Sequence, residues 1–159
     1  MPQTYSVASH RGVARGRPPC IDRRSVLAEL STAADGGEWV LVAEDHDDVR
    51  ESIRAALEQR GYAVLEARNG RDALRQLFEE GAPKVRLIIS DIQMPEMSGL
   101  ELVRVLRSSV SSSEVPVIMI SGELPVERTH PGVHAWVEKP FELNTLMTLV
   151  EQHIAPTER

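Results

Sequence analysis

The sequence contains a single cysteine, Cys20, and few aromatic residues, which make up 4% of its 159 residues. One cysteine excludes an intramolecular disulfide and a cysteine-rich zinc site, so we expect a reducing, cytoplasmic setting. With so few aromatic rings, the core must be built from Leu, Val, Ile and Ala. No apolar run approaches the ~20 residues that span a bilayer, and no apolar stretch of the kind found in export signals follows Arg23-Arg24. We expect neither membrane insertion nor export.

Basic residues are also outnumbered by acidic ones. The sequence has 18 Lys and Arg residues and 24 Asp and Glu residues, which gives a formal net charge of −6. This balance argues against direct nucleic-acid binding, in which Lys and Arg meet phosphates. The glycine-rich phosphate loops G-x-G-x-x-G and G-x-x-x-x-G-K-[ST] are absent as well, which disfavours a nucleotide-binding protein.

The chain divides into an N-terminal extension and one domain. Residues 1–38 combine Gly, Pro and Ser with scattered Arg, a composition typical of disorder, although Val26, Leu27 and Leu30 are spaced for one amphipathic helical turn. The remaining length suits a single domain over residues 39–155 with a short tail at 156–159. We therefore expect a disordered extension before one compact domain.

From Trp39 onward, short β-rich runs alternate with amphipathic helical stretches, which indicates an α/β fold with a parallel sheet. The predicted strands are 39–43, 62–66, 85–90, 115–120 and 133–137. The predicted helices are 48–59, 70–80, 99–107 and 142–154, with Phe78 and Leu143 on their core faces. Pro125 and Pro131 disfavour a full helix between residues 122 and 132. The pattern predicts a doubly wound sheet in which one unit lacks a regular helix.

Chemically useful side chains follow four of the predicted strands. Glu44 and Asp45 follow the first, Asp91 the third, Ser121 the fourth, and Lys139 with Pro140 the fifth. Because a doubly wound sheet gathers functional groups at the carboxyl ends of its strands, we expect these residues to meet. Three adjacent carboxylates repel unless a cation neutralises them, and Mg²⁺ prefers oxygen ligands. A carboxylate can also accept a phosphoryl group as an acyl phosphate, with a metal, a Lys and a hydroxyl neutralising the phosphoryl oxygens.

Each motif also has a simpler interpretation when taken alone. An acidic pair after a strand often caps a helix, a role for which Asp45 or Asp48 qualifies. His130 and His134 have the spacing of a helical metal pair, but Pro131 between them breaks such a helix. We expect these histidines to be loop residues.

Four segments together resemble the response-regulator receiver domain of the CheY-like superfamily. They are Ala-Glu-Asp at 43–45, Ile-Ser-Asp-Ile-Gln-Met-Pro-Glu-Met-Ser-Gly at 89–99, Ile-Met-Ile-Ser-Gly at 118–122 and Val-Glu-Lys-Pro-Phe at 137–141. The second segment is strongly specific, and the resemblance covers residues 39–154. It implies a five-stranded, flavodoxin-like parallel sheet of order 2-1-3-4-5 with helices on both faces. The prolines noted above predict that the fourth helix is short or irregular.

The resemblance also implies a role for individual residues. Asp91 would accept the phosphoryl group. The implied Mg²⁺ ligands are Glu44, Asp45, Asp91 and the backbone carbonyl of Gln93, and the implied phosphoryl contacts are Ser121 and Lys139. Pro140 would follow a cis peptide bond. Trp136 occupies the position of the switch aromatic, with plain packing at the edge of the core as the alternative.

We therefore expect a non-enzymatic phosphoacceptor of a two-component phosphorelay, a monomer or weak dimer whose only reactions are self-phosphotransfer and autodephosphorylation. A sensor histidine kinase or a histidine phosphotransfer protein would be the donor. Since the sequence ends shortly after the last predicted helix, we expect output through a downstream protein partner rather than an attached effector domain.

The sequence disfavours one alternative and leaves another open. A phosphatase of the haloacid-dehalogenase type would need a second Asp two positions after Asp91, where the chain has Gln93. The interval between Ser121 and Lys139 is shorter than the family's by roughly one helical turn, about 3.6 residues. This departure leaves open a receiver-like interaction module that works without phosphorylation.

Overall fold

The computed structural model describes residues 38–109, 114–123 and 129–154. The predicted tail and the predicted extension, apart from Glu38, lie outside these residues. The strands are β1 (Trp39–Ala43), β2 (Ala63–Ala67), β3 (Val85–Asp91), β4 (Val117–Ser121) and β5 (Ala135–Glu138). The helices are α2 (Asp47–Glu58), α3 (Gly70–Leu77), α4 (Gly99–Ser108) and α5 (Leu143–His153). Within the described ranges, no helix has the length and apolar character needed to cross a membrane.

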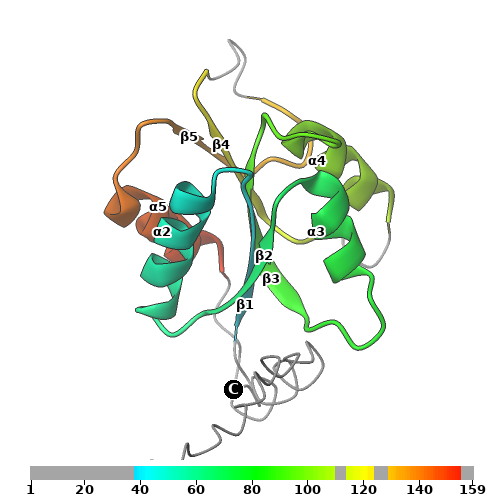
Figure 1. The fold of residues 1–159 in the computed structure, drawn as a ribbon, viewed down its shortest axis with the longest axis horizontal. Coiled ribbons are helices and arrows are strands. Elements are labelled where there is room, and N and C mark those ends of the chain that lie inside the picture. The colour runs from blue at the N-terminus through cyan, green and yellow to red at the C-terminus, as the bar shows by residue number, and fades with distance from the viewer. Residues whose placement is uncertain (1–37, 110–113, 124–128, 155–159) are drawn as a thin grey trace, which may run out of the picture. The chain divides into compact units, whose positions relative to one another are not determined.

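The five strands form one parallel sheet in the order β2-β1-β3-β4-β5. Helices α2 and α5 cover one face and α3 and α4 cover the other, as Figure 1 shows. This architecture confirms the predicted doubly wound sheet and its strand order. Because every strand runs in the same direction, all five carboxyl ends lie at one edge of the sheet.

Alternate residues of each central strand enter two separate cores. In β1, Val40 and Val42 join the core beneath α2 and α5, whereas Leu41 and Ala43 join the core beneath α3 and α4. All five residues of β1 are buried. Burial on both faces explains why the central strands appear in the sequence as continuous apolar runs rather than alternating ones.

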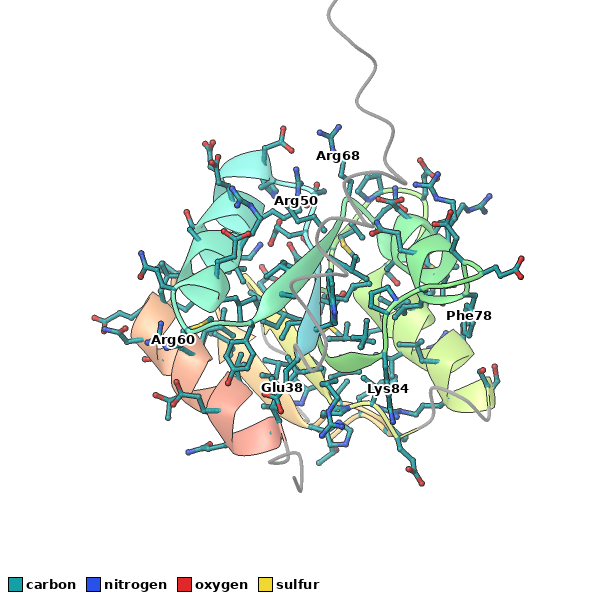
Figure 2. All side chains as sticks on the ribbon, turned by 90° about the horizontal axis from the view of Figure 1, so that it is seen from below. Glu38, Arg50, Arg60, Arg68, Phe78 and Lys84 are labelled. Atoms are coloured by element: carbon teal, nitrogen blue, oxygen red, sulfur yellow. The ribbon has the colours of Figure 1, made fainter. Side chains whose placement is uncertain are left out.

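Two residues predicted to lie in the core are exposed instead. Helix α3 ends at Leu77 rather than at residue 80, and Phe78 leaves the helix with φ −105° and a side chain that is 50% exposed (Figure 2). Leu143 is the first residue of α5 and is 36% exposed. The apolar spacing predicted one buried residue too many in each helix, because spacing alone does not show where a helix begins or ends.

The connection from β4 to β5 departs from regular structure. Residues 124–128 lie outside the described part, and the described residues on either side of them form no helix. Arg107 of α4 links the end of this connection to the segment that precedes β4. Its Nη2 donates to the carbonyl oxygen of Gly132 at 2.6 Å and to that of Val115 at 3.0 Å. Gly132 has φ +93°, and a Cβ there would lie 2.3 Å from Arg107 Nε. Glycine is required at this position both for its backbone conformation and for its lack of a side chain.

Candidate functional site

Sheet register brings the predicted site residues together. Ala43 pairs with Ser90 between β1 and β3, and Asp91 pairs with Ile120 between β3 and β4. Glu44, Asp91 and Ser121, which end or follow these strands, are 1%, 5% and 2% exposed. Three polar residues therefore lie buried at the carboxyl edge of the sheet.

Lys139 joins two of the buried carboxylates. Its Nζ donates to Glu44 Oε2 at 2.8 Å and to Asp91 Oδ2 at 2.7 Å. Burial alone would lower the pKa of Lys139, but the hydrogen bonds with Asp91 and Glu44 outweigh burial and raise that pKa. The ammonium is therefore charged at neutral pH and offsets the repulsion between the two carboxylates. The peptide bond between Lys139 and Pro140 is cis.

The loop after β3 holds the second oxygen of Asp91. Asp91 Oδ1 accepts the backbone N–H of Gln93 at 3.1 Å, whereas the Gln93 side chain is exposed. Gly99 closes the loop by donating its N–H to Ile92 O at 2.9 Å. A Cβ at Gly99 would lie 2.1 Å from the backbone oxygen of Asp91, so this close approach requires glycine. Both carboxylate oxygens of Asp91 are thus oriented by hydrogen bonds.

The acidic cluster has the composition of a site for a divalent cation. Glu44, Asp45, His46 and Asp91 each offer a ligand atom, and these atoms lie within 4.8 Å of one another. Asp45 Oδ1 is buried and makes no hydrogen bond with the residues that the structure describes. A buried carboxylate oxygen that accepts no hydrogen bond is costly unless a positive charge neutralises it, and His46 Nδ1 lies 3.0 Å from this oxygen. Carboxylate and carbonyl oxygens are the ligands that Mg²⁺ prefers, so these residues fit that ion.

His46 is a member of this cluster that the sequence interpretation missed. Its Nδ1 lies 3.0 Å from Asp45 Oδ1 and 3.1 Å from Glu44 Oε1, and the hydrogen bond to Glu44, with the charge of Asp45, raises its pKa. His46 also precedes α2 as its N-cap residue, although its side chain makes no capping bond. The alternative interpretation, in which Asp45 or Asp48 caps the helix, is therefore wrong. The position of His46 directly after the acidic pair was the available signal.

Ser121 ends β4 at the carboxyl edge of the sheet, whereas Trp136 pairs with Met119 two residues earlier in the register. The hydroxyl of Ser121 donates to Glu123 O at 2.5 Å and accepts the Glu123 N–H at 3.1 Å. Trp136 is half-buried and packs against the core beneath α3 and α4. His134 is not near the cluster, because its Nδ1 accepts the backbone N–H of Val117 at 3.1 Å, at the opposite end of β4 from Ser121.

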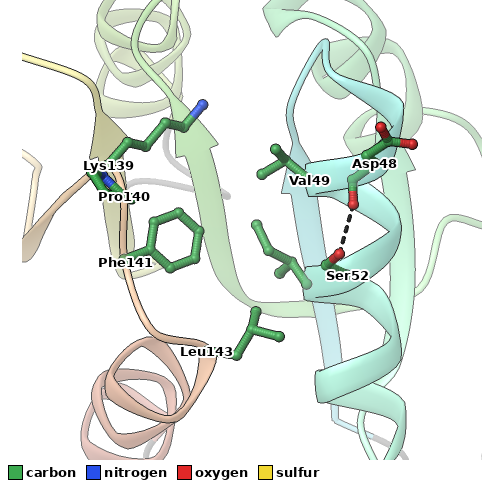
Figure 3. A pocket seen from close by; sticks show the side chains of 8 residues that line it. Asp48, Val49, Ser52, Lys139, Pro140, Phe141 and Leu143 are labelled. Carbon is green, nitrogen blue, oxygen red and sulfur yellow. Dashed lines mark hydrogen bonds between the residues drawn. The ribbon is translucent and has the colours of Figure 1, made fainter.

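A hollow of about 600 Å³ adjoins the site between α2 and the loop that leads into α5. Its walls are mainly apolar and include Val49 and Ile53 on one side and Phe141 and Leu143 on the other. Figure 3 shows Lys139 and Asp48 at its rim. The hollow therefore places an apolar surface directly beside the buried carboxylates.

Comparison with known proteins assigns the chain to a family. The model of the response regulator receiver domain matches residues 40–151. The chain belongs to this family, which confirms the resemblance found in its sequence.

Individual relatives differ in length. The chain is 38% identical over 128 residues to the sensor kinase CckA of Brucella abortus, a match that covers 78% of this chain and 13% of CckA. It is 36% identical over 117 residues to the chemotaxis protein CheY1 of Helicobacter pylori, covering 70% of this chain and 93% of CheY1. Among solved structures, the response regulator TrrA of Thermotoga maritima in complex with Mg²⁺-BeF is 26% identical, with a TM-score of 0.63 over 72% of this chain and 97% of TrrA.

Proposed function

We propose that the chain is a phosphoacceptor of two-component signalling, which takes a phosphoryl group onto Asp91 with Mg²⁺ and changes its binding to a protein partner in response. The observation that supports this most directly is Lys139, whose ammonium joins the buried carboxylates of Glu44 and Asp91. A Lys placed between an acceptor carboxylate and a metal-binding carboxylate suits phosphoryl transfer, because charge on the phosphoryl oxygens must be neutralised from several sides.

In the proposed reaction, an Asp91 oxygen attacks phosphorus, a P–O bond forms, and the P–N bond to the donor histidine breaks. The electron pair of the broken bond remains on the imidazole, which takes up a proton. Glu44, Asp45, Asp91 and the Gln93 carbonyl would hold Mg²⁺, which when bound would neutralise charge on the phosphoryl oxygens. Lys139 transfers its hydrogen bond from Asp91 Oδ2 to the phosphoryl group.

The proposed readout begins at Ser121. Its hydroxyl hydrogen, now donated to the Glu123 carbonyl, has to turn toward the phosphoryl group to bind it. That exchange releases Glu123 and alters the start of the β4–β5 connection. Trp136, half-buried on the adjacent strand β5, then gains room to move inward.

Labelling with a small phosphodonor tests the proposal. Incubation with acetyl phosphate and Mg²⁺ should add one phosphoryl group to the wild type and none to Asp91→Asn, while EDTA should suppress labelling. Labelling of Asp91→Asn to the wild-type extent would place the acceptor elsewhere. A wild type that remains unlabelled would instead favour the interaction module that works without phosphorylation.

We further propose that a phosphohistidine-bearing protein docks over the hollow beside Lys139. The donor imidazole must come within bonding distance of Asp91, and Leu143 presents an exposed apolar side chain on the approach. Leu143→Glu should slow transfer from a phosphorylated histidine phosphotransfer protein at least tenfold and leave labelling by acetyl phosphate unchanged.

Val105 provides the matched control for Leu143. It is 37% exposed, against 36% for Leu143, but it lies on α4 on the other face of the sheet. Phosphoryl transfer to Val105→Glu should therefore proceed at the wild-type rate. Equal slowing by both substitutions, or slowing by neither, would contradict docking over the hollow.

A further inference from the structure

Arg50 is an unusual component of α2. Of the lysines and arginines in the part of the chain that the structure describes, only Arg50 is buried, at 7% exposure. A guanidinium removed from water costs several kcal/mol unless it is fully paired. A buried cation one helical turn away from the acidic cluster therefore needs a physical explanation.

The contacts of Arg50 lead to the main chain of the site. Its Nη1 donates to the backbone carbonyl oxygen of Glu44 at 2.8 Å, and this bond is buried. Its Nε donates to Glu66 Oε1 of β2 at 3.2 Å, and its Nη2 pairs with Asp47 Oδ1. Burial alone would lower the pKa of Arg50, but the hydrogen bond and charge of Asp47, followed by those of Glu66, outweigh burial and raise it. Figure 2 labels this side chain, which extends from α2.

The carbonyl that Arg50 holds belongs to the peptide unit between Glu44 and Asp45. That unit is planar, so fixing its oxygen also fixes the direction in which the chain enters Asp45. The N–H of Glu44 is held as well, because it donates to Ala67 O at 3.0 Å. Asp45 Oδ1, in contrast, makes no hydrogen bond with the described residues. The backbone bond from Arg50 therefore constrains where the Asp45 carboxylate points, together with the contact of Asp45 Oδ1 with the exposed His46 ring, 3.0 Å away.

We propose that Arg50 is a positioning residue for the divalent cation, which orients Asp45 through the Glu44 carbonyl without touching the ion. This inference rests on the proposed function, because the cation belongs to the same site. Partners that orient metal ligands in this way typically change metal affinity about 10- to 100-fold when they are removed.

The sign of the effect separates positioning from simple electrostatics. Removal of a positive charge near an acidic cluster should make cation binding tighter, since the cluster then attracts Mg²⁺ more strongly. Loss of the backbone bond should make binding weaker, because the carboxylate no longer points to the ion. Arg50→Met removes both charge and bond. Arg50→Lys keeps the charge but lacks the planar fork that bonds Glu44 and Glu66 at once.

Arg54 is the matched control. It lies one turn further along α2 and also pairs with Glu66, with its Nε 3.4 Å from Oε2. Its other ion pairs in the described part of the chain are with Glu51 and Glu58 of the same helix, not with Glu44. Arg54→Met therefore removes a positive charge and a bond to Glu66 from the same helix. It leaves the main chain of the metal site untouched.

The test is Mg²⁺ binding measured by isothermal titration calorimetry on the full chain, with folding checked by circular dichroism. We expect Kd to rise about tenfold in Arg50→Met and Arg50→Lys and to stay within about twofold of the wild type, or to fall, in Arg54→Met. In acetyl phosphate labelling, the Mg²⁺ concentration for half-maximal rate should rise by the same factor, while the maximal rate changes less than about twofold. If Arg50→Met does not fold, Arg50→Lys decides.

Folded Arg50 variants that bind Mg²⁺ as tightly as the wild type, or more tightly, would overturn the inference. Mg²⁺ binding by the wild type distinguishes failure of this inference from failure of the proposed function. Normal wild-type binding with unchanged Arg50 variants contradicts only the role of Arg50, whereas a wild type that does not bind Mg²⁺ contradicts the proposed function too.

Discussion

Substitution of Lys139 by Met should destabilise the protein through the two carboxylates that it leaves behind. Glu44 and Asp91 are 1% and 5% exposed, and each accepts a hydrogen bond from the ammonium. Breaking a buried ion pair by removing one partner costs about 3–5 kcal/mol. Because the Lys139 side chain is 23% exposed and partly screened, we expect the lower end, about 3 kcal/mol at neutral pH.

Urea unfolding followed by circular dichroism, in EDTA, measures this loss. The pKa of Lys139 is raised above its ordinary value of 10.5, so its stabilisation is fully present below that pH and is lost only as the pH rises through the raised pKa. A measurement at pH 7 therefore records the full contribution. Lys84→Met is the control, because Lys84 is exposed and should change the free energy of unfolding by less than about 0.5 kcal/mol.

The same experiment in Mg²⁺ should reduce the difference. A divalent cation neutralises carboxylates that the ammonium no longer reaches, so it should stabilise Lys139→Met more than the wild type. At Mg²⁺ concentrations well above both Kd values, the difference should shrink by RT ln of the ratio of the two Kd values, about 1.4 kcal/mol if Lys139→Met binds Mg²⁺ tenfold more tightly. A difference in EDTA below about 1 kcal/mol, or one that Mg²⁺ does not reduce, would refute the view that Lys139 compensates buried charge.

Three further perturbations have defined outcomes. Asp45→Asn removes one of the negative charges clustered within 4.8 Å of one another. The free energy of unfolding, measured with urea in EDTA, should therefore rise by about 1 kcal/mol, and added Mg²⁺ should no longer stabilise the protein. Gly132→Ala places a Cβ against Arg107 at φ +93° and should cost about 2 kcal/mol, whereas Gly122→Ala, with open space around it, should change stability by less than about 0.5 kcal/mol. Burial, followed by the charges of Arg107 and His153, lowers the pKa of His134, so stability should fall as the pH drops below the ordinary value of 6.5, and His134→Gln should weaken that dependence.

Most of the fold followed from the sequence because parallel strands and amphipathic helices have different apolar periods. All five strands were predicted within two residues of their observed bounds, and β1 matches at both ends. Helix ends were less predictable, since Phe78 continues the apolar spacing of α3 but lies beyond its last turn. Capping and chain reversal determine where a helix ends, and the spacing of apolar residues does not reveal either.

The site followed from the sequence only as far as strand ends determine it. Glu44, Asp91 and Lys139 were expected to meet because each follows or ends a parallel strand, and their side chains are in contact. Arg50 was not anticipated, because a cation inside an amphipathic helix has the same appearance in a sequence whether it faces water or the main chain of a neighbouring loop. Its role depends on a bond to a backbone carbonyl, which side-chain patterns do not reveal.

Chemical trapping of an aspartyl phosphate identifies the residue that accepts the phosphoryl group, which we expect to be Asp91. Borohydride reduces an aspartyl phosphate to homoserine, so peptide mass spectrometry after treatment with acetyl phosphate, Mg²⁺ and borohydride locates the modified residue. We predict homoserine at position 91 alone, dependent on Mg²⁺. Homoserine at another aspartate, or an unmodified Asp91 in a protein that carries the added phosphoryl group, would contradict the account.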